Sequence, residues 1–226
     1  MKNCILLIIL SVNILSGKSQ TIDLSLQAGI STPLLDFRSS DLSRGSFALT
    51  GFAGSIKLQC PVKGNWGAFV QSGIQLNPIN VSVLGYEKVK ADPFLDDLYI
   101  RSDPFKTIEI TGGPTYKMQI LQKLSLEAKL DAGLMMASTP YQLNKPSYFI
   151  VGPAFFEITP STDYCFTYGG GISFIYAISP CYSIGVNSQY LQAHGKFKFI
   201  QGQSIRTDER NINLWNNNLS IIVKLF

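Results

Sequence analysis

The sequence predicts an all-β fold, a closed up-and-down barrel of eight antiparallel strands, on three observations. Polar and apolar residues alternate along eight segments of the chain. Short turns and long loops join these segments in alternation. After the signal-like first segment, no stretch reaches the about 18 consecutive apolar residues that a membrane helix needs.

The segment from Lys123 to Met136, KLSLEAKLDAGLMM, shows how the strands are identified. Its Leu, Glu, Ala and Lys residues favour a helix by intrinsic propensity. At about 100° per residue, however, its apolar residues would scatter around a helix and leave no buried face. At a period of two they all fall on one side, from Leu124 to Leu134. Because burial normally overrides propensity, the pattern predicts a strand.

The same alternation marks seven further segments, each near the about 9 to 11 residues that cross a bilayer when tilted. The eight predicted strands are residues 22–31, 52–59, 66–76, 107–120, 123–136, 166–178, 182–190 and 216–226. Tight turns lie at residues 61–65, 121–123 and 179–181, and long connections at 32–46, 78–105, 137–164 and 192–213. Short turns at one rim and long loops at the other are typical of transmembrane barrels, and such loops are uncommon in compact soluble domains.

Composition and charge argue against an ordinary soluble domain and against a nucleic-acid-binding protein. Only 15% of the 226 residues are charged, against about 25% in a typical soluble domain, while 46% are hydrophobic. The net charge of +4 comes without a long basic run, so nucleic-acid binding is not predicted.

The first 19 residues have the pattern of a secretory signal peptide. Lys2 precedes an apolar segment at residues 5–15, and small residues follow up to Ser19. We expect cleavage near Ser19, which leaves residues 20–226 as the barrel domain; an uncleaved anchor is the alternative. Cleavage would leave three cysteines: Cys60, Cys165 and Cys181. They lie too far apart in sequence to predict a disulfide framework, although one disulfide between two of them stays an alternative in an oxidising compartment.

The chemistry of the two faces indicates which one meets lipid. The polar faces hold Gly, Ser, Thr, Asn and Gln rather than the Lys and Glu of a water-exposed surface, and small residues suit the crowded interior of an eight-stranded barrel. The apolar faces carry aromatic residues near several strand ends, as an interfacial girdle requires. The predicted girdle comprises Trp66, Tyr116, Tyr168, Tyr176, Tyr182 and Tyr190. The alternative is a secreted lipocalin-like barrel with its apolar face inward around a small apolar ligand.

The signal peptide, the opening strand LSLQAGISTPLLDF, the alternating connections and the terminal strand ending in Phe226 resemble the small outer-membrane β-barrel proteins of Gram-negative bacteria, of the porin-family or OmpA-like kind. The resemblance implies a barrel surrounded by outer-membrane lipid with both termini in the periplasm. It also implies that the barrel-assembly machinery reads the terminal aromatic residue. In this chain the face of Phe226 contains Ser220 and Lys224, so we assign the alternate residues from Leu219 to Leu225 to lipid and Phe226 to the interface.

Charged residues on the inward faces predict an interior charge network. If the 121–123 turn leaves Ile120 opposite Leu124, then Lys117 lies opposite Glu127. Opposed unlike charges contribute about 0.2–1 kcal/mol in a sheet. The predicted network comprises Lys57, Glu109, Lys117, Glu127, Lys129 and Asp131. A conductive or proton-handling site is the alternative, but eight strands leave an interior that side chains just fill.

The sequence offers little support for catalysis. Resemblance to the eight-stranded barrels that modify lipid A would imply a catalytic histidine at the outer rim, together with a serine or an acid. The single histidine of this chain is His194. No motif ties it to a serine and a carboxylate, and no spacing indicates a metal or a cofactor. We therefore expect no enzyme, with a His194-dependent lipid A-modifying enzyme as the alternative.

The two longest connections are rich in aromatic residues and proline, unlike solvated loop tips. They contain ADPFLDDLYIRSDPF from Ala91 and KPSYFIVGPAFFEITP from Lys145. They are either strands that extend above the membrane or a surface for a protein or ligand, and an extra hairpin would make ten strands. The predicted role is structural or interactive: membrane integrity, adhesion, or a subunit of a surface or secretion assembly with a protein partner at these loops.

Overall fold

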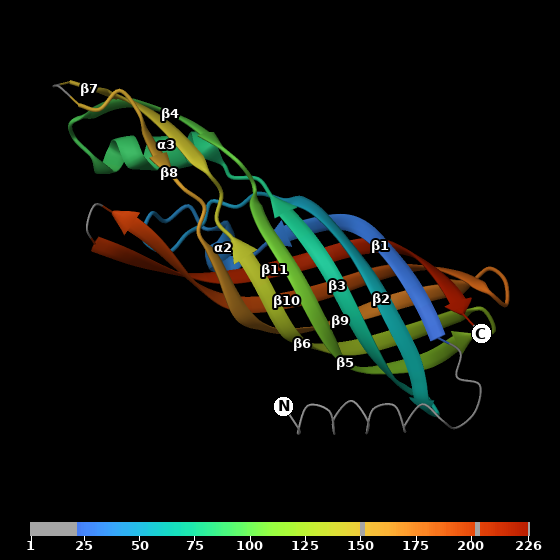
Figure 1. The fold of residues 1–226 in the computed structure, drawn as a ribbon. Helices are drawn as coiled ribbons and strands as arrows, with labels where there is room; N and C mark the ends of the chain where they lie inside the picture. The colour runs from blue at the N-terminus through green and yellow to red at the C-terminus, as the bar shows by residue number, and fades with distance from the viewer. Residues whose placement is uncertain (1–21, 150–151, 202–203, 226) are drawn as a thin grey trace, which may run out of the picture.

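Eight antiparallel strands close into a barrel in the computed structural model, which describes residues 22–149, 152–201 and 204–225 (Figure 1). The predicted signal peptide, residues 1–19, and Phe226 lie outside the described residues. The barrel strands are β1 (Ile22–Pro33), β2 (Gly51–Lys63), β3 (Trp66–Asn77), β5 (Phe105–Leu121), β6 (Leu124–Ser138), β9 (Thr162–Ala177), β10 (Tyr182–Gln201) and β11 (Ser204–Leu225). Each overlaps one predicted strand, and no predicted strand extends more than one residue beyond the observed one, so the predicted eight-stranded antiparallel barrel is confirmed.

The first and last strands close the ring. β1 pairs with β2 on one side and with β11 on the other, so that Ala28 lies opposite both Gly54 and Leu219. The order around the barrel is β1-β11-β10-β9-β6-β5-β3-β2. Closure leaves no free edge, which is the condition for a sheet to span a bilayer.

The apolar face of the barrel points outward, as predicted. Leu26, Leu130 and Ile221 are 53%, 66% and 59% exposed, whereas their neighbours Gln27 and Asp131 are 7% and 3% exposed. The lipocalin-like alternative requires the reverse arrangement and is wrong.

The short turns lie at one end of the barrel, called the turn end here, and the long connections at the other, called the loop end. Gly64 in the β2–β3 turn has a φ of 59°, a left-handed conformation that glycine adopts without strain. All three predicted tight turns are present.

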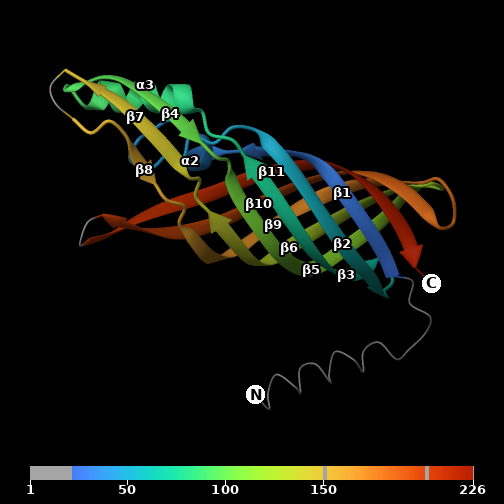
Figure 2. The same cartoon turned by 45° about the horizontal axis from the view of Figure 1, so that its top comes forward.

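The second and third long connections fold together beyond the loop end (Figures 1 and 2). Strands β4 (Leu95–Ser102), β7 (Gln142–Tyr148) and β8 (Phe156–Ile158) form a separate sheet, and helix α3 (Val81–Ala91) packs against β4. We call α3 and this sheet the loop unit. Its core includes Leu84, Leu95, Leu98 and Ile100, all buried. The ten-stranded alternative is therefore wrong, because β4 pairs with β7 outside the barrel.

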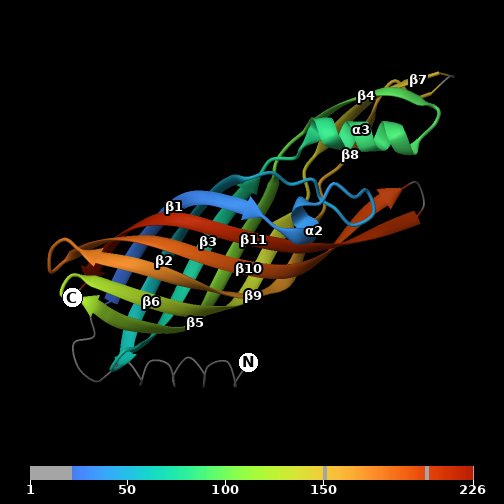
Figure 3. The same cartoon turned by 180° about the vertical axis from the view of Figure 1, so that it is seen from behind.

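The first and fourth connections also differ from plain loops. The first contains the short helix α2 (Leu35–Arg38). The fourth is a continuation of β10 and β11, which stay paired up to Gln201 and Ser204 and run past the other strands (Figure 3). The predicted loop 192–213 is therefore wrong, because the period-two pattern continues through it. Among the described residues, no helix has the length and apolar character needed to cross a bilayer.

Asn80 caps helix α3, since its side-chain oxygen accepts a hydrogen bond from the Val83 N–H at 3.2 Å. Replacing Asn80 by Ala removes this acceptor and should cost about 1 kcal/mol of helix stability. We expect the Val83 and Leu84 amides to exchange with deuterium about fivefold faster, with barrel amides unchanged. Asn80→Asp keeps an acceptor, so its Val83 and Leu84 amides should exchange at the same rate as in the parent. Equal exchange in Asn80→Ala and the parent would contradict the capping role.

Candidate functional site

An ion pair crosses the lumen in the turn-end half of the barrel. Lys57 Nζ on β2 lies 2.7 Å from Glu127 Oε1 on β6, and both side chains are almost wholly buried. Gln59 donates a hydrogen bond to the second oxygen, Glu127 Oε2, at 2.7 Å, and another to Thr115 Oγ1 at 3.2 Å. Both carboxylate oxygens are thus satisfied, which a buried charge requires.

A second polar layer surrounds Lys129. Its Nζ lies 3.3 Å from Asp131 Oδ1 and donates to Gln71 Oε1 at 2.8 Å. Gln71 in turn donates to Gln189 Oε1 at 3.1 Å, which links β3 to β10 on the far wall. The ammonium also lies 5.1 Å from the ring centroid of Phe69, within range of a cation–π contact.

Glu109 and Lys117 hold more peripheral positions in the predicted network. Glu109 is buried, with Gln71 Nε2 at 3.5 Å from its Oε1, and Gly73 leaves room for its carboxylate, because a Cβ there would lie 2.9 Å from Oε1. Lys117 is half-buried near the turn end. It lies opposite Glu127, the register expected from the short turn, yet Glu127 pairs with Lys57.

Three glutamines of the network were not singled out from the sequence: Gln59, Gln71 and Gln189. All three occupy inward positions of their strands, so the period-two pattern places them in the lumen. What the pattern lacks is the distance across the lumen, which decides which side chains meet.

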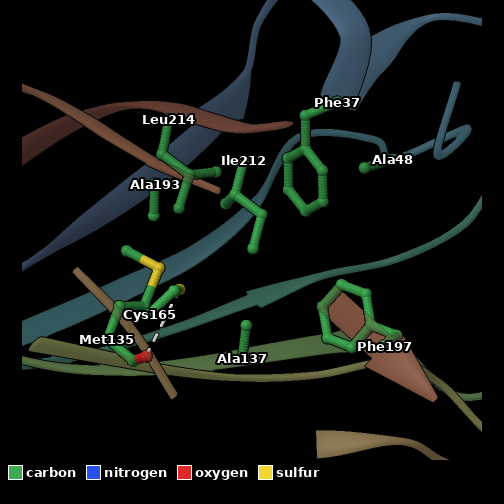
Figure 4. Packing of buried hydrophobic residues seen from close by; sticks show 9 residues of the cluster. All are labelled: Phe37, Ala48, Met135, Ala137, Cys165, Ala193, Phe197, Ile212 and Leu214. Carbon is green, nitrogen blue, oxygen red and sulfur yellow. Dashed lines mark hydrogen bonds between the residues drawn. The ribbon is translucent and has the colours of Figure 1, made fainter. Parts of the chain in front are cut away.

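Toward the loop end, the inward positions of β6, β9, β10 and β11 become apolar. Met135 and Leu214 are fully buried, and Phe37 enters from α2 to contact this layer (Figure 4). We call the following residues the apolar cluster: Phe37, Ala48, Met135, Ala137, Cys165, Ala193, Phe197, Ile212 and Leu214. The sequence pattern did not predict this cluster, because only polar residues were assigned to the inward face. The signal was present: Met135 continues the register of Glu127.

Backbone strain occurs in the segment that carries Phe37. Leu35 and Phe47 have φ values of 50° and 55°, a left-handed conformation that costs a non-glycine residue about 1–2 kcal/mol. The Leu34 N–H donates to Asn213 O at 2.9 Å, and the Ala48 N–H donates to Phe37 O at 3.2 Å. These bonds hold the first connection over the barrel mouth.

The six residues of the predicted girdle lie on the outer face in two groups. Trp66, Tyr116, Tyr176 and Tyr182 lie near the turn end, where Trp66 and Tyr116 form an edge-to-face pair with centroids 5.1 Å apart. Tyr168 and Tyr190 lie further toward the loop end, and the Tyr190 hydroxyl donates to Asn213 Oδ1 at 2.9 Å. Their role as membrane anchors stays a prediction.

His194 lies on the outer face of the β10–β11 extension. Its Nδ1 is 2.9 Å from Asn211 Oδ1, and its Nε2 is 3.5 Å from Glu209 Oε2. Lys196 Nζ lies 2.9 Å from the other oxygen of Glu209; this contact raises the pKa of Lys196 and lowers the pKa of Glu209, which favours both charges. Within the described part of the chain, no serine hydroxyl hydrogen-bonds to the imidazole. The arrangement is that of a polar surface cluster.

The cysteines are separate in the fold. Cys60 is half-buried, Cys165 is buried in the apolar cluster and Cys181 is exposed, and all three are free thiols. In the ranges that the structure describes, no group of three or more His, Cys, Asp or Glu residues could hold a metal ion.

The loop unit exposes large aromatic side chains. Phe94 and Phe149 are 60% and 70% exposed and are adjacent, because the Phe149 N–H donates to Phe94 O at 3.2 Å. Tyr86, Tyr99 and Phe155 are also exposed on this unit or its connections. Exposed aromatic groups of this kind are enriched at protein interfaces.

Comparisons with known proteins bear on the fold. No protein-family model matches the sequence, and no curated protein matches it. Neisserial surface protein A matches the structure with a TM-score of 0.56 at 14% identity over 92% of this chain and 100% of that chain. A major outer membrane protein of Thermus thermophilus matches with a TM-score of 0.58 at 8% identity, over 92% of this chain and 100% of that chain. Outer membrane protein AlkL matches with a TM-score of 0.51 at 9% identity, over 92% of this chain and 94% of that chain.

Removing Glu127 should be costly, because it leaves the Lys57 ammonium buried without a partner. We expect Glu127→Ala to lower the free energy of unfolding by about 3–5 kcal/mol, measured by urea unfolding in phospholipid vesicles. The double variant Lys57→Met/Glu127→Leu removes both charges and should recover most of that loss.

Glu109→Gln is the matched control within the same lumen. Within the described residues Glu109 has no ion-pair partner, and glutamine keeps its shape, so this variant should lose far less stability than Glu127→Ala. Equal stability of Glu127→Ala and the parent would contradict a network centred on Glu127.

Proposed function

We propose that this chain, an outer-membrane β-barrel by its fold, is a closed membrane anchor that presents the loop unit for interaction at the cell surface. The observation that carries this proposal is the loop unit itself, which has its own sheet and buried core and exposes Phe94 and Phe149. Of the predicted roles of membrane integrity, adhesion and membership of a surface or secretion assembly, adhesion or membership of a surface assembly fits this feature best.

The proposed orientation has the loop end outside the cell and the turn end in the periplasm. It follows the rule that barrels of this kind have short periplasmic turns and longer extracellular loops. In this proposal residues 1–19 are cleaved as a signal peptide, residues 20–226 form the barrel, and both termini are periplasmic. The barrel-assembly machinery reads the terminal strand with Phe226.

The lumen supports an anchor rather than a pore. Ion pairs and amide groups cross it in the turn-end half, and the apolar cluster packs across it at the loop end. Eight-stranded barrels have interiors that side chains fill, and an apolar constriction opposes the passage of water and ions. The interior is then a plug that rigidifies the support of the loop unit.

The matched neighbours agree with this interpretation at the level of location. The Neisserial protein is named a surface protein and the Thermus protein an outer membrane protein. Because this chain has the same fold, we place it in the outer membrane, surrounded by outer-membrane lipid.

A closed lumen predicts no ion conductance. Purified protein inserted into planar lipid bilayers should produce no current steps above the lipid baseline, because both halves of the lumen are filled. A wide diffusion porin measured in parallel shows that insertion and detection work. Reproducible steps from the purified protein would contradict the closed anchor.

Photo-crosslinking in intact cells tests the role of the loop unit. We expect benzoylphenylalanine at position 149 to give a discrete protein adduct, because Phe149 is exposed on the proposed interaction surface. The neighbouring substitution Phe94→Ser should abolish that adduct. Benzoylphenylalanine at the lipid-facing Phe174, which is 51% exposed, is the matched control. Identical labelling at positions 149 and 174 would contradict surface recognition through the loop unit.

A further inference from the structure

A cavity of about 660 Å³ lies between the loop unit and the mouth of the barrel. All four long connections contribute to its walls, including Phe47 of the first, Leu84 and Leu98 of the second, Tyr148 of the third and Phe197 of the fourth. The volume falls in the range of about 300–1,000 Å³ that small-molecule sites occupy. Mostly apolar walls of this kind suit a ligand with an aliphatic or aromatic body.

One positive charge in this wall has no carboxylate partner. Lys88 of α3 lines the cavity and is half-buried, and its Nζ donates to the neutral side-chain oxygen of Asn144 at 3.2 Å. No carboxylate lies within 4.0 Å of this ammonium in the portion of the chain that the structure describes. Burial lowers the pKa of Lys88, the direction expected for an ammonium that leaves water without a carboxylate beside it.

The other charged groups of the wall are already engaged or lie in solvent. Asp208 accepts contacts from Arg206 at 3.1 Å and from Arg210 at 3.3 Å. Asp92 accepts a hydrogen bond from the Phe94 N–H at 3.0 Å. Glu157 is exposed. Lys88 is therefore the cation of this wall that no carboxylate contacts in the described ranges.

Two buried polar atoms near this cavity also have no partner. Ser46 lines the cavity, is only 6% exposed, and its hydroxyl makes no hydrogen bond within the described ranges. Asn144 is fully buried, and its Nδ2 is likewise unpartnered there. A buried polar group without a partner costs about 1–3 kcal/mol, so the hydroxyl of Ser46 makes this wall better suited to a polar ligand group than to a hydrocarbon alone.

We propose that this cavity binds a small amphipathic carboxylate, with the carboxylate on Lys88 Nζ and the apolar body between the loop unit and Phe197. A neutral hydrocarbon would cover the ammonium without pairing it, and burying an unpaired charge is unfavourable. An inorganic anion would leave the apolar walls in water. An amphipathic carboxylate satisfies both parts of the wall.

Octanoate is the probe, and octanamide is its neutral counterpart of the same length. Binding is measured by ligand-observed NMR titration of the full protein in lipid nanodiscs, with protein-free nanodiscs subtracted. We expect octanoate to bind at least tenfold more tightly than octanamide. Lys88→Gln should weaken octanoate about tenfold, a factor that corresponds to about 1.4 kcal/mol, and leave octanamide unchanged.

Two further variants separate charge from space. Lys90→Gln removes a lysine of the same helix that does not line the cavity and should change neither affinity. Ala91→Trp adds bulk at an exposed position of the wall and should weaken both probes. Circular dichroism checks that each variant keeps its sheet content.

Three results would overturn the proposal: no octanoate binding above protein-free nanodiscs, equal losses in Lys88→Gln and Lys90→Gln, or full affinity in Ala91→Trp. This inference goes beyond surface recognition by the loop unit. The titration tests the cavity alone, and the crosslinked adduct at position 149 tests surface recognition alone. Failure of one proposal is therefore distinguishable from failure of the other.

Discussion

The hydrocarbon of a bilayer offers the backbone no hydrogen-bond partner, and the rest of this structure depends on that constraint. Each N–H and C=O in the span must be paired within the sheet, so the sheet has to close. Here closure falls between β1 and β11, where Ala28 meets Leu219. Once the sheet is closed, a period of two assigns each residue either to lipid or to the lumen. The apolar exterior, the polar interior and the small residues on the inward face all follow from this assignment.

The lumen combines two ways of filling a narrow space. In the turn-end half, Lys57 and Glu127 are buried, and each of these two charges remains tolerable because it is paired with the other. At the loop end the same inward register carries Met135 and Leu214, and Phe37 closes the layer from above. In the proposed anchor, these two layers plug the lumen and give the loop unit a rigid base at the loop end.

The parts of the fold that depend on local alternation could be predicted from the sequence, and the parts that depend on distant contacts could not. All eight strands and three tight turns follow from period two. The continuation of β10 through Ala193 and Phe197 keeps that period. Because its inward residues change from polar to apolar, the polar-inward pattern did not identify it as part of the strand. Helix α3 begins at a capping residue, Asn80, within a stretch that shows no clear periodicity. The sheet of the loop unit pairs β4 with β7, two segments from different connections. Likewise, register places Lys117 opposite Glu127, but Lys57 reaches it across the lumen from a strand 70 positions away.

Semi-native gel mobility of the membrane-fractionated protein, unboiled and boiled in detergent, tests the central claim most directly. A closed barrel resists detergent because every strand is paired on both sides, so unboiled protein from the outer-membrane fraction should migrate as a compact species. Boiling should shift it to the mobility of the unfolded chain. Protein that is recovered in the soluble fraction, with the same mobility before and after boiling, would contradict a barrel closed within the membrane.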